Sequence, residues 1–442
     1  MKSKTAVNLL SLGIIAGSLV ALISICVIFV RYINRARGPN VILVVTDALR
    51  PDHLGCYGYQ RDTSNNIDLF ANDSMLFTNA IAQAPATLIS VWNILISKYQ
   101  PNASLTNDYN AIPEYFKSKG YKTAAFISQK LLDEQKIYFK RGFDVFDSKS
   151  PPKRYKIPSR VAESITNSSI QWLEKNKQRP FFILMWYFDT HDPYDAPDGF
   201  RGYYNKIPYR DRDRDPIKEH KMGGYIKSDI SEEKKRILIN AYDEEVRYVD
   251  CEFGRFLDYL KESGRYNNSI IIFISDHGEE LGDNNNRWDH CQLLSQEEIH
   301  VPLIIKMPWQ EKKKVITAAV QIVDIYPTLI EYFDKEKPPS YYVKLEGKSL
   351  IPLINGRPLS DDDRYAASFW EPQRCIIKGN YKYWFLSRRD HLIDIKNNKE
   401  IDDSKLKREL KTELNKIYNK YILNKNIYGD LVKKLKSIGY MH

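Results

Sequence analysis

Four nearly continuous apolar runs constrain the fold of this chain more than any other feature. They are Asn40–Thr46, Phe181–Phe188, Ser269–Ser275 and Val301–Met307. Runs of this length, rich in β-branched and aromatic residues, are typical of strands buried on both faces of a parallel sheet. Helical patterns lie between the runs, at Asp68–Asp73, Ile112–Gly120, Ala162–Asn176 and Glu232–Ser263. Strands that alternate with helices predict an α/β fold with helices on both faces of the sheet.

The pattern changes near Gly347. A hairpin-like series of short apolar stretches follows, at Arg374–Ile377, Tyr381–Leu386 and His391–Ile395, and then a charged helical stretch. We therefore predict three parts: an N-terminal anchor and linker (1–38), a main α/β domain (39–346), and a small C-terminal α+β subdomain with a basic helical tail (347–442). The middle of the main domain is interrupted by Asp198–Gly224, a polar stretch that predicts a long surface insertion.

The N-terminal stretch Ala6–Val30 carries no charged residue over 25 positions. As a helix rising ~1.5 Å per residue, it is long enough to span a hydrocarbon core of ~30 Å. It exceeds the roughly 7–15 apolar residues of a signal peptide, and no small-x-small cleavage site follows it. We expect a single-pass transmembrane helix, with a cleaved signal peptide as the alternative. Lysines before it and arginines after it leave its orientation undecided.

Charge and cysteine content exclude several other classes of protein. The formal net charge is +10, but lysine and arginine are scattered among acidic residues. Because no basic stripe with interleaved aromatic residues stands out, we expect no binding to nucleic acid. The five cysteines show no C-x-x-C spacing, so neither a zinc ribbon nor a disulfide framework is predicted.

Polar residues that follow the apolar runs are candidates for chemistry, because open α/β sheets bind ligands beyond the carboxyl ends of their strands. The first run is followed by Asp47, the second by Asp189 and His191, and the third by Asp276 and His277. Carboxylate oxygens and imidazole nitrogens are ligands that zinc and manganese accept. Three strands with such endings predict a metal-dependent hydrolase.

The segments around these strand ends resemble sulfatases, a family of the alkaline-phosphatase superfamily. The resemblance follows the family's order over roughly residues 40 to 395, in the segments Asn40–Tyr59, Phe181–Pro197, Tyr242–Asp283, Trp288–Pro308 and Val323–Phe333. It implies a large mixed, mostly parallel sheet flanked by helices. It also implies a metal-dependent catalytic domain that cleaves or transfers a phosphate or sulfate ester.

The resemblance assigns site residues one by one. It implies that Asp47, Asp276 and His277 bind a divalent metal ion, while Ala48 stands where many arylsulfatases have a further aspartate. His191 and His290 align with residues that contact the transferred group or its leaving oxygen. Because His277 offers a nitrogen ligand, we expect manganese or zinc before calcium, which prefers oxygen ligands.

The largest departure from the family lies at the nucleophile. Sulfatases carry a C-x-P-S-R or S-x-P-S-R segment whose first residue is oxidised to formylglycine. Thr87 stands at that position here, followed by Ile89 and Val91 in place of Pro and Arg. The related phosphoethanolamine and phosphoglycerol transferases use an unmodified threonine that also ligates the metal. This similarity implies Thr87 as both nucleophile and metal ligand, and favours phosphorus esters over sulfate esters.

Several residues near the motifs allow a structural role. Thr87 itself could be a helix N-cap. For Arg50 an ion pair is as good an expectation as a functional role, and for His53 we expect a supporting loop position. Glu279 and Glu280 could lie behind the metal ligands or begin a helix whose dipole they complement, and we favour the helix start. The lysine and histidine of a further family loop are replaced by Ser128 and Lys130.

Three other readings remain open on the sequence. One is a catalytically impaired, membrane-anchored binding protein on the same fold, which Ile89, Val91 and Ser128 favour. Another is a true sulfuric ester hydrolase. The third is a two-metal phosphatase, although Asp189 and His191 have the wrong spacing for its second site. The expected partners are an ester substrate, with a glycan or lipid head group as candidates, and the membrane. As in most relatives, we expect the catalytic domain outside the cytoplasm.

Overall fold

The computed structural model describes residues 38–99, 110–128, 139–148, 161–177, 180–205, 230–357 and 364–422. The predicted membrane helix Ala6–Val30, most of the predicted insertion at 198–224, Lys130 and the end of the basic tail lie outside these residues. Within them, every helix is too short or too polar to cross a bilayer.

A nine-stranded sheet forms the centre of the described chain, in the order β10-β2-β9-β6-β1-β5-β3-β4 with β11 also paired to β2. The strands are β1 (Asn40–Thr46), β2 (Met75–Ile81), β3 (Lys122–Ile127), β4 (Val145–Asp147), β5 (Phe181–Tyr187), β6 (Ser269–Ser275), β9 (His300–Lys306), β10 (Lys314–Ile316) and β11 (Val320–Gln321). All four predicted strands are present. Strands β2 and β3, which mix apolar and polar residues, were not anticipated from the sequence.

The sheet is mixed, as the resemblance implies, and its one reversed strand is β9. β1 pairs in parallel with β5 and β6, whereas β9 runs antiparallel to both β2 and β6. The interpretation of Val301–Met307 as a parallel strand was therefore wrong. An apolar run records burial on both faces but not strand direction, because direction depends on how the neighbouring strands are connected.

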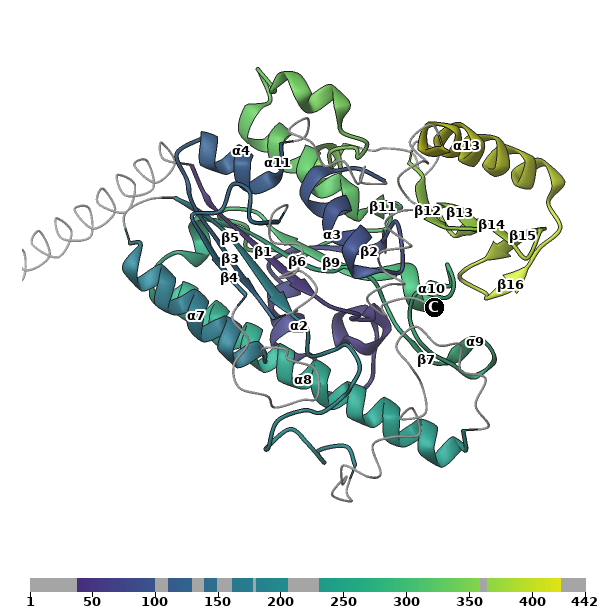
Figure 1. Ribbon diagram of the computed structural model, residues 1–442, viewed down its shortest axis with the longest axis horizontal. Helices are drawn as coiled ribbons and strands as arrows, with labels where there is room; N and C mark the ends of the chain where they lie inside the picture. Colours follow the sequence, from purple (N-terminus) through teal and green to yellow (C-terminus); the bar gives the residue numbers. More distant parts are fainter. Residues whose placement is uncertain are drawn as a thin grey trace, which may run out of the picture.

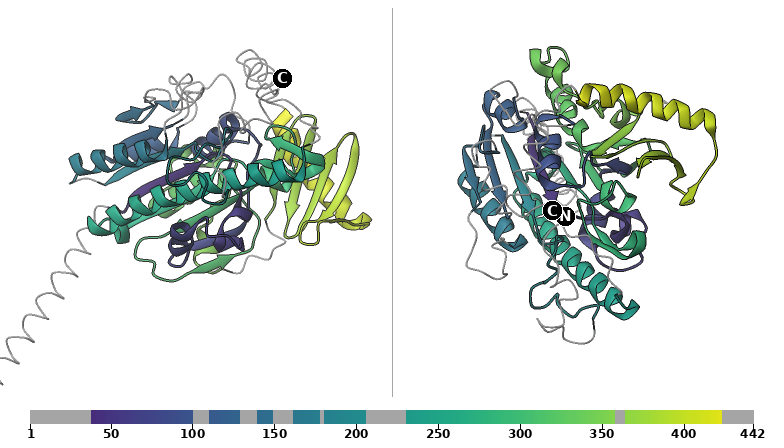
Figure 2. Two further views of the ribbon diagram at one scale, coloured as in Figure 1. Left: turned by 90° about the horizontal axis from the view of Figure 1, so that it is seen from below. Right: turned by 45° about the vertical axis from the view of Figure 1, so that its right-hand side comes forward.

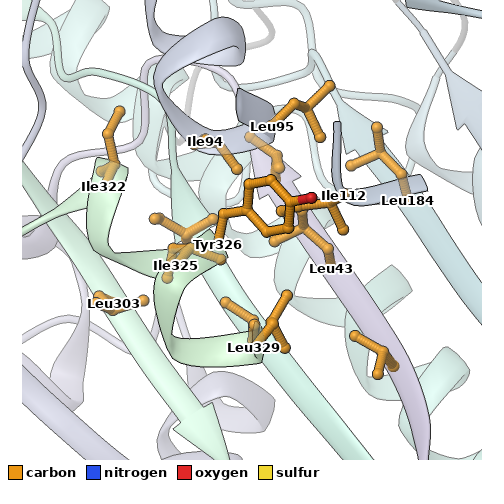
Figure 3. Close-up of a cluster of buried hydrophobic side chains, with 14 of the residues drawn as sticks. Leu43, Ile94, Leu95, Ile112, Leu184, Leu303, Ile322, Ile325, Tyr326 and Leu329 are labelled. Carbon is orange, nitrogen blue, oxygen red and sulfur yellow. The ribbon is translucent and has the colours of Figure 1, made fainter. Parts of the chain in front are cut away.

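Two helical layers cover the sheet (Figure 1). One layer contains α3 (Thr87–Ile96), α4 (Ile112–Ser118) and α11 (Ile325–Asp334), and the other contains α2 (Asn65–Ala71), α7 (Ala162–Lys175) and α8 (Glu232–Glu262). Alternate residues of β1 face opposite layers: Leu43 packs with the first, and Ile42 with the second. Figure 3 shows Leu43 beneath Tyr326 and Leu329 of α11. The helices predicted on both faces are confirmed.

A second, antiparallel sheet lies beside the central one (Figure 2). Its strands are β12 (Ala366–Trp370), β13 (Gln373–Lys378), β14 (Tyr381–Leu386), β15 (Arg389–Asp394) and β16 (Lys399–Glu400), and helix α13 (Ser404–Ile422) packs on it through Leu410 and Leu414. This sheet accounts for the hairpin pattern in the sequence. Leu350 and Leu353, near the predicted boundary at residue 347, pack in the core of the large sheet.

Short elements complete the described chain. They are β7 (Glu280–Gly282), β8 (Arg287–Asp289), α9 (Asp283–Asn286), α10 (Gln296–Ile299), α12 (Ile351–Ile354) and the 3-10 turns Pro51–His53, Gly55–Tyr57, Tyr266–Asn268, Ile322–Asp324 and Ser340–Lys344. β7 and β8 form a small separate antiparallel pair. The segment from β7 to α10 follows β6 along the chain, at the carboxyl end of the sheet.

Candidate active site

Asp47 and Asp276 meet because β1 and β6 are neighbouring parallel strands that end together. Thr46 pairs with Ser275, and the Asp276 N–H donates to the Thr46 carbonyl at 3.2 Å. The Ala48 N–H in turn donates to Asp276 Oδ1 at 3.2 Å. Both carboxylates are fully buried. The prediction that these strand ends converge is confirmed.

The backbone turns sharply after Asp47. Ala48 has a positive φ of 59°, a left-handed conformation that costs an alanine some strain. The Thr190 hydroxyl donates to the Asp47 carbonyl at 2.5 Å, and the Trp186 indole N–H donates to Asp47 Oδ2 at 3.3 Å. These contacts fix the Asp47 side chain with Oδ1 directed toward Thr87.

Helix α3 carries Thr87 to the same place. The N-cap of α3 is Ala86, and Thr87 is the first helical residue. The interpretation of Thr87 as a side-chain N-cap was therefore wrong. Its buried hydroxyl lies 3.4 Å from Asp47 Oδ1 and 3.1 Å from His277 Nε2. The N-terminal end of a helix carries partial positive charge, so an anion held at Thr87 would be favoured.

His277 presents an unprotonated nitrogen to the three oxygen-bearing side chains. Its Nδ1 lies 2.8 Å from the Gly278 carbonyl oxygen, which can only accept, so Nδ1 carries the hydrogen and Nε2 a lone pair. Nε2 lies 3.6 Å from Asp47 Oδ1 and 3.4 Å from Asp276 Oδ2. Asp276 Oδ2 is buried and accepts no hydrogen bond within the described chain.

These donors fit a single divalent cation. Asp47, Asp276 and His277 form a group whose ligand atoms lie within 4.8 Å of one another. Ligands placed tetrahedrally around zinc at its usual bond lengths stand about 3.3–3.6 Å apart, close to the spacings found here. Without a cation, burial and the Asp276 charge raise the pKa of Asp47 well above its usual value. Burial also raises the pKa of Asp276 to about 7.

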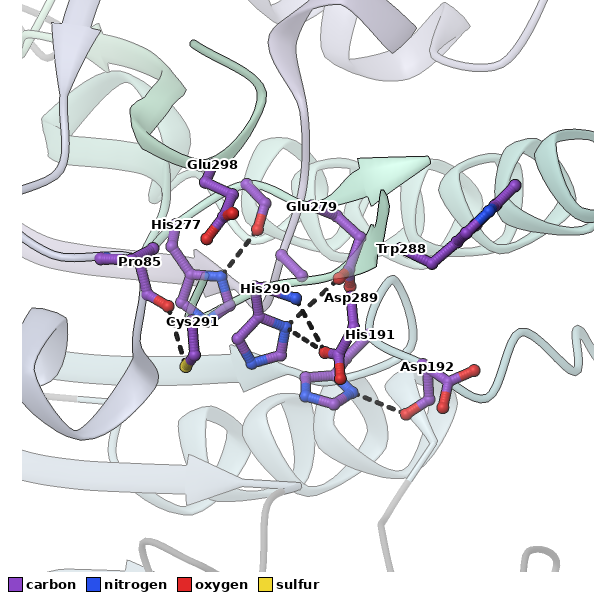
Figure 4. A network of polar contacts seen from close by, with 12 residues as sticks. Pro85, His191, Asp192, His277, Glu279, Trp288, Asp289, His290, Cys291 and Glu298 are labelled. Atoms are coloured by element: carbon purple, nitrogen blue, oxygen red, sulfur yellow. Dashed lines mark hydrogen bonds and ion pairs between the residues drawn. The ribbon is translucent and has the colours of Figure 1, made fainter. Parts of the chain in front are cut away.

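His290 lies beside this group, with its ring centroid 4.3 Å from that of His277. Its Nδ1 sits between two carboxylates, 3.2 Å from Glu279 Oε1 and 2.9 Å from Asp289 Oδ1 (Figure 4). Burial by itself lowers the pKa of His290, but Cys291, Asp289 and Glu279 raise it well above its usual value. Burial also raises the pKa of the Cys291 thiol, to about 11. At neutral pH the thiol is therefore uncharged, and the carboxylates are the groups that raise the pKa of His290.

His191 completes the set from the loop after β5. Its ring stacks on Phe188, with centroids 4.4 Å apart, and meets His290 edge-on at 4.8 Å. Its Nδ1 donates to the Asp192 carbonyl at 2.6 Å. Burial, with the His290 charge, lowers the pKa of His191 to about 4. His191 is therefore neutral at physiological pH and offers a lone pair on Nε2.

Sequence reasoning raised a supporting role for Glu279 but did not favour it, and it missed Asp289. We interpreted Glu279 and Glu280 as the start of a helix, which was wrong: Glu280 begins β7, and the Glu279 carboxylate is buried against His290. Asp289 was not singled out at all. The only signal in the sequence was an unusual density of acidic residues around His277 and His290.

Other predicted residues support the site from outside. Arg50 forms ion pairs with Asp52 at 2.7 Å and Asp283 at 2.5 Å, which confirms the structural expectation for it. His53 pairs with the buried Asp243 at 2.6 Å. Asp189 does not join the metal group, because its Oδ1 accepts from the Ala162 N–H at the start of α7.

Ser128, which stands in place of a family lysine, follows β3 and is buried. Its hydroxyl donates to the Trp186 carbonyl at 2.8 Å. The serine therefore bonds to the strand next to β1. It adds no positive charge to the site.

Residues 39–335 match the family model described as "Sulfatase". The chain belongs to the sulfatase family and is a sulfatase-family ester hydrolase.

Individual relatives agree. An arylsulfatase of Clostridium perfringens is 25% identical, over 88% of this chain and 95% of that protein. A solved structure in complex with D-glucosamine-2-N,6-O-disulfate as its substrate superposes with a TM-score of 0.68 at 20% identity, covering 88% of this chain and 98% of the other. The phosphonate monoester hydrolase of Agrobacterium radiobacter gives a TM-score of 0.66 at 17% identity, covering 87% and 96%.

Proposed function

We propose that this chain hydrolyses or transfers phosphate or sulfate esters with Thr87 as its nucleophile, and that phosphorus esters are the better substrates. The observation that carries the proposal is the position of the Thr87 hydroxyl, 3.1 Å from His277 Nε2 and 3.4 Å from Asp47 Oδ1. A hydroxyl buried among metal-type ligands at a helix N-terminus is placed to act as an activated nucleophile.

Asp47, Asp276, His277 and Thr87 would hold one divalent ion, with manganese or zinc favoured over calcium because His277 supplies nitrogen. Such an ion, when bound, lowers the pKa of a coordinated hydroxyl and offsets negative charge on the transferring group. Glu279, Asp289 and His290 also have donor types that suit a metal. His290 Nδ1 already contacts one oxygen of each carboxylate and would have to leave both to bind a metal, so we expect one ion rather than two.

Thr87 Oγ1 would lose its hydroxyl proton to solvent and form a bond to phosphorus or sulfur, while the bond from that atom to the ester oxygen breaks. Water or a second alcohol would then attack the same atom and release Thr87. The N–H groups of Thr87 and Leu88 lie in the first turn of α3. Their partial positive charge would stabilise the negative charge of the transferred group. Asp47 would present its other carboxylate oxygen in a fixed orientation, because Trp186 and Thr190 hold the residue in place.

The departing oxygen needs a proton, and the geometry favours His290 over His191 as its source. The two carboxylates on His290 Nδ1 stabilise the imidazolium, whose Nε2–H is the proton that it would donate. His191 has its one hydrogen engaged with Asp192. Its neutral ring is better suited to accept a hydrogen bond from the substrate.

Phosphorus esters are favoured because of how the covalent intermediate resolves. Formylglycine releases sulfate when its hydrate collapses to an aldehyde, without a second attack on sulfur. Thr87 cannot do this, so its adduct has to be displaced in line by water or alcohol. Phosphoryl groups undergo such displacement readily near a divalent ion. The likeness in fold to a phosphonate monoester hydrolase is consistent with this choice.

Sulfate esters are the second candidate, because the matching family model and the arylsulfatase relative point to them. For the non-reacting part of the substrate, a glycan or a lipid head group is proposed. A disulfated glucosamine is the substrate of one relative in fold. We further propose that Ala6–Val30 anchors the enzyme in a membrane with its catalytic domain outside the cytoplasm.

A substrate panel tests the function. Aryl phosphate, phosphodiester, phosphonate monoester and sulfate ester are each assayed with added manganese, zinc or calcium. We expect phosphorus esters to turn over fastest with manganese or zinc, and a covalent adduct on Thr87 with slow substrates. Robust sulfate ester hydrolysis that survives Thr87→Ala, without phosphoesterase activity, would refute the proposal.

A further inference from the structure

The hairpin between β12 and β13 is far from the site in sequence but contacts the segment that follows His290. Trp370 ends β12 and Gln373 begins β13, and the two residues pair across the hairpin. The Trp370 indole N–H donates to the Cys291 carbonyl at 2.9 Å. Gln373 donates to the Gln292 carbonyl at 2.8 Å and accepts from the Leu294 N–H at 3.2 Å.

The same hairpin contacts the segment that leads to Thr87. The Phe369 N–H donates to the Gln83 carbonyl at 2.9 Å, and the Ser368 hydroxyl donates to the Ala82 carbonyl at 2.6 Å. Trp370 also packs in one buried cluster with Ala84 and Ala86, which directly precede Thr87. β12 is therefore bonded to both catalytic segments.

The two catalytic segments also touch each other directly. The Cys291 N–H and thiol both lie 3.1 Å from the Pro85 carbonyl oxygen (Figure 4). Cys291 has a positive φ of 64°, so this turn depends on its contacts to keep a conformation that non-glycine residues rarely adopt. The contacts that could hold it come from Pro85 on one side and Trp370 on the other.

We infer that Trp370 and Gln373 are positioning residues, which set the place of His290 relative to Thr87 by holding residues 291–294. The inference rests on the proposed roles of Thr87 and His290. The amide of Gln373 satisfies two backbone groups of a segment without regular secondary structure, and Trp370 satisfies a third. The C-terminal sheet thereby completes the active site, although none of its residues is assigned to the chemistry.

The matched control is Trp384 of β14, on the same sheet. Its indole nitrogen is buried and, within the described chain, has no hydrogen-bond partner. Trp370→Phe and Trp384→Phe therefore remove similar ring volume, but only the first removes a hydrogen bond to the catalytic segment. Gln373→Met removes both hydrogen bonds of the side-chain amide while keeping the length of the side chain.

The experiment measures kcat and KM for these three variants of the full chain with an alkyl phosphate, whose leaving group needs a proton, alongside melting temperature, metal content and amide hydrogen exchange at residues 292–294. We expect Trp370→Phe and Gln373→Met to lower kcat about tenfold, since small displacements of catalytic groups are costly. KM and metal content should stay near those of the wild type. The Leu294 amide should exchange faster in Gln373→Met, and Trp384→Phe should keep its kcat within about twofold.

Equal kcat for Trp370→Phe and Trp384→Phe, or unchanged exchange at Leu294 in Gln373→Met, would overturn the inference. Should Gln373→Met fail to fold, Trp370→Phe carries the test, because it keeps an aromatic ring in the cluster. Failure of the proposed function would look different: turnover would survive Thr87→Ala, while the exchange measurement would still report whether the hairpin holds residues 291–294.

Discussion

The two halves of the site are held in different ways. Asp47, Asp276 and His277 follow two paired strands of the central sheet, and their spacing is set by the register between Thr46 and Ser275. Thr87 and His290 lie on a helix start and on a loop, which meet through Pro85 and Cys291. The sheet therefore places the proposed metal ligands, whereas the proposed nucleophile and acid depend on contacts distant in sequence.

The strongest test of this contrast is Thr87→Ala. It should lower kcat for a phosphoester by a thousandfold or more, on the order expected when a nucleophile is removed. Metal content should fall only in part, because the three strand-end ligands remain. Enzyme assays combined with elemental analysis check both outcomes. Complete loss of metal with a folded protein would show that the sheet alone does not hold the ion.

His277→Ala should empty the metal site, because the only nitrogen ligand of the group is lost and two buried carboxylates remain. Turnover should be lost with the metal. Metal analysis of the purified variant, with circular dichroism as a control for folding, provides the measurement. A well-folded variant with wild-type metal content would rule out His277 as a ligand.

His290→Gln should keep the metal and lower kcat about a hundredfold for alkyl esters, the scale of general acid catalysis. The loss should be smaller for nitrophenyl esters, whose leaving group needs no proton. The ratio of the two rates therefore separates proton donation from simple misplacement. An equal loss for both leaving groups would argue against His290 as the acid.

The smallest effect is expected for Glu279→Gln. The glutamine keeps the size of the side chain but removes one of the two charges that hold the His290 proton, so kcat should fall roughly tenfold, as for other residues that orient a site group. A Glu279→Gln enzyme with wild-type rates would mean that Asp289 alone suffices.

Much of the sheet could be predicted because burial leaves a direct record in the sequence. β1 and β6 have the predicted limits, and β5 and β9 differ from prediction by one residue. The direction of β9 could not be predicted, since parallel and antiparallel central strands share one apolar pattern. α2 begins three residues earlier than predicted, at Asn65, because Asp250 of α8 accepts from the N–H groups of Asn66 and Ile67.

The sequence by itself determined the α/β class, the strands that end in Asp47 and Asp276, and the threonine in place of a formylglycine precursor. These depend on side-chain type and on the rule that parallel strands share a carboxyl edge. Only the tertiary structure decided that Glu279 and Asp289 share the His290 proton, and that Trp370 and Gln373 bond the loop behind it. Asp289 is a sequence neighbour of His290, but the contacts of Glu279 and Trp370 join residues 11 and 79 positions apart through loops without periodicity, so no local pattern encodes them.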